Sequence, residues 1–213
     1  MNQQGITIAL FGASGATGRQ IVEQAHRKGV SIKALVRKQS NDAHLDGILV
    51  KTGDFNNAKT LDALITNCRA VICVIGPRPP FRDIFCGSAT QSIIDSMMRV
   101  GVKRLVCQTG AMIGEYKANR RLLFRWLTHS VQKKYPAMTE DRAQQERLIL
   151  QSDLDWTIVK PSRLTNGRRT GRINAAVDLK MGLLSKISRA DLACFLLDQV
   201  ESNEFSRQAV FVK

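Results

Sequence analysis

The stretch 10-LFGASGATGRQ-20 decides the fold of this chain, because three evenly spaced glycines separate two different sequence patterns. Residues 6–11, ITIALF, form the short apolar run of a buried β-strand. Residues 17–28 carry apolar side chains at helical spacing and are expected to form a helix. A strand, a glycine-rich turn and a helix in this order predict the start of a β–α–β unit.

The residues of this turn suit the binding of a pyrophosphate. Gly12 allows a tight turn, Gly15 lets the backbone approach the phosphates, and Gly18 lets the helix pack closely on the strand. Ser14 and Thr17 add hydroxyl donors to the N–H groups of the first helical turn. A glycine-rich turn without a ligand is the alternative, and the complete β–α–β pattern favours the binding site.

The same alternation of apolar runs and helical patterns continues along the chain. It predicts further strands at 32–36, 48–50, 70–75, 104–109, 156–160 and 208–213. It predicts further helices at 57–67, 87–100 and about 139–152, and a last helix that begins near Ser188. We therefore expect an α/β fold: a Rossmann-like, doubly wound, mainly parallel sheet with helices on both faces. We expect a single domain over residues 1–213, with substrate-side elements at about 110–137 and 161–187.

The residues after the second expected strand distinguish between the two nicotinamide cofactors. An NAD site usually places an aspartate or glutamate there, which binds the 2′-hydroxyl of the ribose. This chain has Arg37 and Lys38 instead, and its next acidic residue is Asp42. Because an arginine can bind the 2′-phosphate of NADP, the cofactor is predicted to be NADP(H) rather than NAD. Two solvated surface cations are the alternative.

The net charge of +14 at pH 7 indicates an anionic partner: nucleic acid, a membrane surface or a small acidic ligand. The sequence contains no recognised nucleic-acid-binding module, so binding of nucleic acid is not expected. No apolar run reaches the roughly 18–20 residues that span a bilayer, and the first residues lack a signal-peptide pattern. We expect a cytoplasmic protein, and the sequence is compatible with a monomer.

The cysteines and histidines do not form a metal-binding pattern. Cys73, Cys107 and Cys194 lie inside apolar segments, and no C-x-x-C pair occurs. The three histidines are far apart in the sequence. We therefore expect buried free thiols and no metal site.

Several motifs along the chain together resemble one family. They are GASGATG at 12–18, Arg37, Gly53-Asp54, Val74-Ile75-Gly76 and LDWTIVKPSRL at 154–164. With these motifs the chain resembles the atypical short-chain dehydrogenase/reductases that have an NmrA-like NAD(P)-binding domain. It is most similar to the flavin reductase and biliverdin-IXβ reductase branch through MTEDRAQQERLILQSDLDW (138–156), Thr170-Gly171 and SKISRADLACFLL (185–197). The resemblance covers nearly the whole chain and is thinnest at 110–137.

The resemblance implies roles for individual residues. The pyrophosphate would be lined by Gly12, Ser14, Gly15, Ala16, Thr17 and Gly18, and the 2′-phosphate held by Arg37 and Lys38. The adenine would be bordered by Asp54 and Phe55, the ribose on the nicotinamide side by Ile75 and Gly76, and the nicotinamide by Thr109 and Gly110. Pro161 and Ser162 would lie near the reactive face, with Arg163 and Met112 toward the substrate. For Ile75, Gly76 and Pro161 a purely structural role is the alternative.

The chain lacks the Tyr-x-x-x-Lys pair with which ordinary short-chain dehydrogenases exchange a proton with an alcohol. Tyr116 is followed four residues later by Arg120, and Tyr135 by Thr139. Arginine is too basic to replace the lysine of that pair. We therefore do not expect reversible alcohol dehydrogenation, and we interpret both tyrosines as structural.

A second departure is Gly110, where the similar branch carries a serine. Thr109 is then the candidate hydroxyl beside the nicotinamide, unless water alone supplies the proton.

The leading hypothesis is an NADPH-dependent reductase that transfers hydride to a conjugated, anionic acceptor: a flavin, a quinone or a bilin such as biliverdin. The alternative is a non-catalytic, NmrA-like protein that senses NADP(H) or binds a partner. A sugar-nucleotide epimerase fits less well, because the Tyr-Lys pair is missing.

Residues 117–134 contain six cations and no acid, interleaved with apolar side chains. We favour the interpretation that this segment is a core-packing helix with a solvated polar face. The second interpretation is a lid over the nicotinamide, whose cations attract an acidic acceptor. A basic amphipathic helix that docks on a membrane or nucleic acid is a third interpretation.

A second basic cluster follows the strand at 156–160 and consists of Arg163, Arg168, Arg169 and Arg172. Of these we expect Arg163 to face an anion.

Overall fold

The computed structural model describes residues 5–36, 45–81 and 83–213. The strands are β1 (Thr7–Phe11), β2 (Ser31–Val36), β3 (Leu49–Thr52), β4 (Ala70–Cys73), β5 (Arg104–Gln108), β6 (Asp155–Pro161), β7 (Arg163–Thr165), β8 (Ala175–Ala176), β9 (Lys186–Ser188) and β10 (Gln208–Val212). The helices are α1 (Ala16–Lys28), α2 (Ala58–Ile65), α3 (Cys86–Val100), the 3₁₀ turn η2 (Lys117–Asn119), α4 (Leu122–Lys134), α5 (Pro136–Gln151) and α6 (Arg189–Asp198).

The central sheet has eight strands in the order β3-β2-β1-β4-β5-β6-β10-β8, and only the β10–β8 pair is antiparallel. The strand order reverses between β1 and β4, which is the switch point where open α/β sheets bind ligands. This topology confirms the predicted Rossmann-like fold. Strands β7, β8 and β9 were not predicted, because two or three residues are too short to show a periodic pattern.

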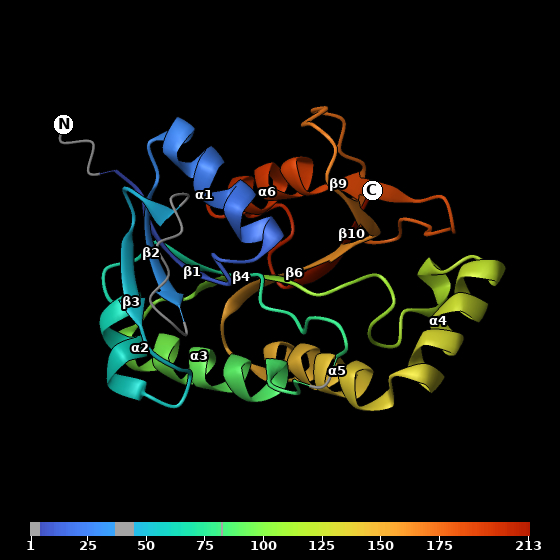
Figure 1. Cartoon of the computed structure of the whole chain (residues 1–213), viewed down its shortest axis with the longest axis horizontal. Coiled ribbons are helices and arrows are strands. Elements are labelled where there is room, and N and C mark those ends of the chain that lie inside the picture. The colour runs from blue at the N-terminus through green and yellow to red at the C-terminus, as the bar shows by residue number, and fades with distance from the viewer. Residues whose placement is uncertain (1–4, 37–44, 82) are drawn as a thin grey trace.

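Helices cover both faces of the sheet (Figure 1). Helices α1 and α6 pack together on one face, whereas α2, α3 and α5 form a row on the other. A hydrophobic core lies on each face of the sheet, and successive side chains of β1 point into the two cores alternately. Ile8 and Leu10 belong to one core, and Ala9 and Phe11 to the other. Because the central strands are buried on both sides, their sequences are almost continuously apolar.

Helix α4 lies at one end of the molecule, beyond the start of α5 (Figure 1). Only Phe124 and Thr128 of this helix are buried. The favoured interpretation of a core-packing helix holds for the face that carries Phe124 and Leu127. It does not hold for Leu122, Leu123 and Trp126, which are exposed, because an apolar residue in a helix does not show whether it meets a core or solvent. In the described part of the chain, no helix is both long and apolar enough to cross a membrane.

Candidate functional site

The glycine-rich turn joins β1 to α1 at the carboxyl edge of the sheet. Gly12 has a φ of 99°, and a Cβ there would lie 2.9 Å from the carbonyl carbon of Val74. At Gly18, a Cβ would lie 2.1 Å from the carbonyl oxygen of Gly12. These two glycines therefore have the predicted roles. Gly12 permits the turn beside the end of β4, and Gly18 lets α1 lie close to that turn.

The amino-terminal end of α1 has no side-chain cap. Its N-cap residue is Gly15, and the first turn contains no acidic residue. By contrast, Asn57 caps α2, Ser188 caps α6 as expected, and the carboxylate of Asp141 accepts hydrogen bonds from the first two N–H groups of α3. The N–H groups and the positive end of the helix dipole of α1 thus suit an anion such as a pyrophosphate.

Four residues were predicted for the adenosine side of the cofactor. Arg37 and Lys38 lie outside the described residues, whereas Asp54 and Phe55 follow β3 at the carboxyl edge of the sheet. The carboxylate of Asp54 accepts a hydrogen bond of 2.8 Å from the backbone N–H two residues on, which shapes the turn after β3. The ring of Phe55 lies 5.9 Å from that of Phe11, the last residue of β1. Phe55 therefore lies against the end of β1, where the glycine-rich turn begins, whereas Asp54 shapes the turn after β3.

A cavity of about 420 Å³ opens at the carboxyl ends of β4, β5 and β6. Helices α4 and α5 supply apolar walls through Phe124, Leu127, Val131 and Met138. Because neighbouring parallel strands end at one edge, residues from distant parts of the sequence meet there. Eight of the predicted site residues line this cavity: Ile75, Gly76, Thr109, Gly110, Met112, Pro161, Ser162 and Arg163.

Two polar atoms in the cavity wall have no hydrogen-bond partner among the described residues. They are the hydroxyl of Ser162 and the side-chain carbonyl oxygen of Gln108. A buried polar group left unsatisfied costs about 1–3 kcal/mol, so such groups are nearly always paired. The two atoms therefore fit the polar groups of a bound dinucleotide or substrate. Ser162 was predicted from the sequence, whereas Gln108 was not.

Thr109 is connected to a buried ion pair that the sequence did not reveal. Its hydroxyl donates a hydrogen bond of 2.5 Å to Oε1 of Glu146, and the same oxygen accepts a hydrogen bond from Nζ of Lys160. The side chains of Lys160 and Glu146 are only 0% and 3% exposed. Burial lowers the pKa of Lys160 to about 8, although Glu146 acts in the opposite direction. Glu146 also lines a second cavity, of about 400 Å³.

Tyr116 packs over this ion pair. Its ring centroid lies 4.3 Å from Nζ of Lys160 and 5.4 Å from the ring of Phe211. Burial raises the pKa of Tyr116 to about 12, with a further contribution from the nearby Glu146. The phenol therefore keeps its proton near neutral pH and packs against the ammonium of Lys160.

Two buried arginines hold the loops that form the cavity. The guanidinium of Arg142 donates to the carbonyl oxygens of Ile75 and Gln108, at 2.8 Å and 3.1 Å. The guanidinium of Arg120 donates to the carbonyl oxygens of Ala111, Ile113 and Gly114. Arg120 is therefore not one of the solvated cations of the basic stretch 117–134, because its charge is used to fold the loop after β5.

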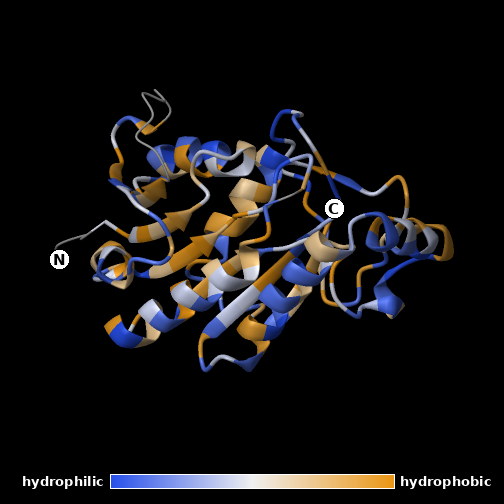
Figure 2. Cartoon of the chain, turned by 60° about the horizontal axis from the view of Figure 1, so that its bottom comes forward, coloured by the Kyte–Doolittle hydropathy of each residue, from blue (hydrophilic) through white to orange (hydrophobic). Residues whose placement is uncertain are grey.

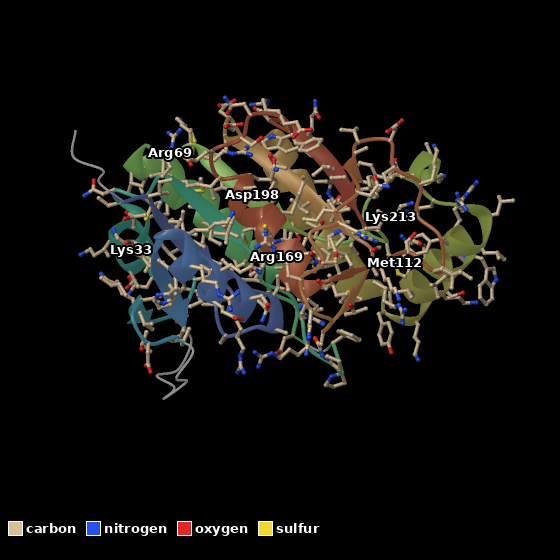
Figure 3. The ribbon with its side chains drawn as sticks, turned by 90° about the horizontal axis from the view of Figure 1, so that it is seen from above. Lys33, Arg69, Met112, Arg169, Asp198 and Lys213 are labelled. Carbon is tan, nitrogen blue, oxygen red and sulfur yellow. The ribbon has the colours of Figure 1, made fainter. Side chains whose placement is uncertain are left out.

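The predicted basic cluster after β6 is divided between two places. Arg163 lines the cavity at the strand ends, whereas Arg168 and Arg169 line a separate hollow of about 440 Å³ beside α1. Figure 3 shows Arg169 near α6, well apart from Met112 on the side of α4. Of the four clustered arginines, Arg163 is thus the one that borders the predicted substrate site.

The cysteines are structural. All five are buried, as expected, and none is paired. The described residues contain no group of three or more histidine, cysteine, aspartate or glutamate side chains that could hold a metal ion.

A family model described as NAD(P)H-binding matches residues 12–203 of the chain. The match begins at the first glycine of the turn and continues past α6. It therefore includes both the turn and the strand ends that line the cavity.

Individual proteins also resemble the chain along most of its length. An uncharacterised chloroplastic protein of Arabidopsis thaliana is 27% identical over 209 residues, which cover 92% of this chain and 73% of the relative. A short-chain dehydrogenase/reductase from Veillonella parvula, solved in complex with NADP, has a TM-score of 0.79 at 17% identity and covers 97% and 94% of the two chains. ChuY, an anaerobillin reductase from Escherichia coli O157:H7, has a TM-score of 0.78 at 20% identity, with 97% and 96% covered. At these identities the two structures show the fold alone.

Proposed function

The chain belongs to the NAD(P)H-binding family, and from this membership we propose that it is an NADPH-dependent reductase. Its acceptor is a conjugated molecule such as a flavin, a quinone or a bilin; ChuY, which has the same fold, is described as an anaerobillin reductase. The observation that carries the proposal is the cavity beside the glycine turn, whose wall presents a hydroxyl bonded to a buried ion pair.

The residues present fit a dinucleotide. The uncapped end of α1 would hold the pyrophosphate, and the polar atoms of Ser162 and Gln108 would bind polar groups on the nicotinamide side. Arg37 would bind the 2′-phosphate, as its place after the second strand predicts. When bound, the cofactor supplies the hydride, so the chain itself has to orient the two reactants and handle a proton.

The cavity suits a flat, conjugated acceptor. Phe124, Leu127 and Val131 offer apolar surface on which a ring system can pack. Arg163 is a cation in the same cavity and attracts an anionic substituent, such as a phosphate or a propionate. Orientation of such an acceptor against the cofactor supplies much of the rate enhancement.

Thr109 supplies the proton that accompanies the hydride. Its hydroxyl proton passes to the acceptor while Glu146 returns a proton received from the ammonium of Lys160. Lys160 becomes a neutral amine. Glu146, which lines the second cavity, then takes up a proton from water there and passes it to this amine. The lowered pKa of about 8 makes Lys160 a better proton donor near neutral pH than an ordinary lysine.

The proposal is tested by measuring NADPH oxidation with purified protein and a panel of FMN, FAD, soluble quinones and biliverdin. We expect at least one acceptor to be reduced well above the rate in buffer. Binding of NADPH without any turnover above buffer would overturn the proposal and favour the non-catalytic, NADP(H)-sensing alternative.

Replacing Arg37 with alanine is expected to weaken the binding of NADPH but not that of NADH. Losing a hydrogen bond to a charged group costs about 1.5–3 kcal/mol, which corresponds to a rise of roughly 10- to 150-fold in Kd. Titration of cofactor fluorescence measures both affinities. An equal loss for the two cofactors would instead assign Arg37 a structural role.

Replacing Thr109 with valine is expected to slow turnover by about 10²–10⁴-fold, because the variant has no hydroxyl to transfer a proton. The Kd for NADPH should change little, since the methyl groups fill the same space. Thr109→Ser is the matched control and should keep most of the activity. Full activity in the valine variant would show that the proton comes directly from water.

A further inference from the structure

Several large apolar side chains lie exposed on α4 and on the loop before β9. Their exposed fractions are 80% for Leu122, 68% for Leu123, 70% for Trp126, 47% for Leu183 and 90% for Leu184. These five residues form what we call the α4 patch. Scattered exposed apolar residues are ordinary, but a contiguous group that includes a tryptophan indicates an interaction surface.

The two parts of the patch are adjacent, although they are about sixty residues apart in the sequence. The backbone N–H of Arg121 donates a hydrogen bond of 3.0 Å to the carbonyl oxygen of Met181. A Cβ added to Gly182 would lie 3.5 Å from Cδ of Arg121. These contacts place the start of α4 beside Leu183 and Leu184. In Figure 2, hydrophobic residues alternate with hydrophilic ones along α4 at the right-hand end of the molecule.

The patch is surrounded by positive charge. Lys117, Arg121, Arg125, Lys133 and Lys134 are exposed on the same segment, and no acidic residue occurs between residues 117 and 134. The sixth cation, Arg120, is turned inward and does not contribute. Glu115 and Asp178 are exposed acids at the flanks, so the local balance stays positive. An apolar surface with a basic rim is complementary to an anionic lipid surface, where headgroups meet cations and the acyl boundary receives tryptophan and leucine.

We propose that the α4 patch docks on an anionic membrane surface. Trp126 and the leucines enter the boundary between headgroups and acyl chains, and the surrounding lysines and arginines contact the headgroups. The protein remains peripheral, because the inserted surface comes from one short helix and a loop.

Docking places the acceptor cavity at the membrane. Leu183 belongs to the α4 patch and also lines the cavity, and the inner side of α4 forms another part of the cavity wall. A lipid-soluble acceptor such as a long-chain quinone could therefore reach the cavity without crossing water. This consequence rests on the proposed reductase function, whereas the docking itself does not.

The test is binding to sonicated vesicles of phosphatidylcholine with and without 30 mol% phosphatidylglycerol, followed by flotation and by tryptophan fluorescence. Trp126 is the exposed tryptophan and Trp156 is only 5% exposed, so a blue shift on binding reports the patch. We expect binding to the anionic vesicles that weakens with added salt. Vesicle binding is independent of turnover, so its failure and failure of the reductase proposal are distinguishable.

Two sets of variants test the surface itself. The first variant combines Leu122→Ser, Leu123→Ser and Trp126→Ser, and the second combines Arg121→Glu with Arg125→Glu. We expect each to reduce vesicle binding, measured by flotation, at least tenfold. The matched control is Leu49→Ser, since Leu49 is 51% exposed on β3 at the opposite edge of the sheet. NADPH binding should be unchanged in all of them, which shows that they fold.

Three results would overturn the docking proposal. They are the absence of binding to anionic vesicles, equal binding by the triple-serine and unmodified proteins, and a dimer in light scattering that the triple variant abolishes. The last result would assign the patch to contact between two copies of the chain. Binding to duplex DNA without binding to vesicles would likewise count against a lipid partner.

Discussion

Replacing Lys160 with methionine is expected to lower the free energy of unfolding by about 3–5 kcal/mol, the cost of leaving a buried charge without its partner. The side chain of Lys160 is fully buried, and that of Glu146 is 3% exposed. Methionine has a similar length and fills the space, so the effect measures the lost charge rather than a cavity. Urea-induced unfolding followed by circular dichroism gives the free energy.

Two further variants separate the ion pair from general packing. Combining Lys160→Met with Glu146→Gln should restore a large part of the stability, because no unpaired charge remains. The exposed pair of Lys28 and Asp198, with side chains 39% and 52% exposed, provides the control. Lys28→Met should cost less than about 1 kcal/mol. A similar cost for both lysine variants would contradict the assignment of a strong buried pair.

Replacing Gly18 with alanine is expected to abolish tight binding of NADPH and to destabilise the chain. The new Cβ would lie 2.1 Å from the carbonyl oxygen of Gly12 and 2.7 Å from Cα of Ala13, and both are backbone atoms. The start of α1 must therefore move away from the turn, which costs about 1–3 kcal/mol in stability. We expect the Kd for NADPH to rise by about 100-fold or more, equivalent to roughly 2.7 kcal/mol.

Fluorescence titration and thermal unfolding measure these two effects. Gly5→Ala is a suitable control, since a Cβ there meets its nearest atom at 3.4 Å, an ordinary contact. It should leave both quantities nearly unchanged. Unaltered NADPH affinity in the Gly18→Ala variant would remove the glycine turn from the cofactor site.

The fold could be predicted because its signals are local. The run ITIALF became β1, and the apolar pattern that follows the turn became α1. Side-chain alternation within a buried strand and apolar spacing along a helix both follow from backbone geometry. The alternation of the two patterns then requires a parallel sheet with helices on both faces. The cavity residues beyond β4, β5 and β6 were expected from the family resemblance, and they meet because parallel strands end at one edge of the sheet.

Helix α5 shows why the centre of the site could not be predicted. Its buried residues include Asp141, Arg142, Gln145 and Glu146, although charged and amide side chains are mostly exposed in folded proteins. Each has a partner from elsewhere in the chain. Asp141 binds the amino-terminal end of α3, Arg142 the ends of β4 and β5, the side-chain N–H of Gln145 the Thr90 hydroxyl, and Glu146 the ammonium of Lys160. The strand sequence WTIVK gave no sign that its lysine points inward, because strand ends often carry exposed cations.

The sequence by itself determined the sheet, its helical layers and the glycine turn at the edge between β1 and α1. Only the tertiary structure decided which charges are buried, that Thr109 contacts Glu146 and Lys160, and that α4 presents leucines and Trp126 to solvent. The physical reason is the range of the interactions. Secondary structure follows from neighbours a few residues apart, whereas a charge can be buried only where the fold brings a compensating partner from elsewhere in the chain.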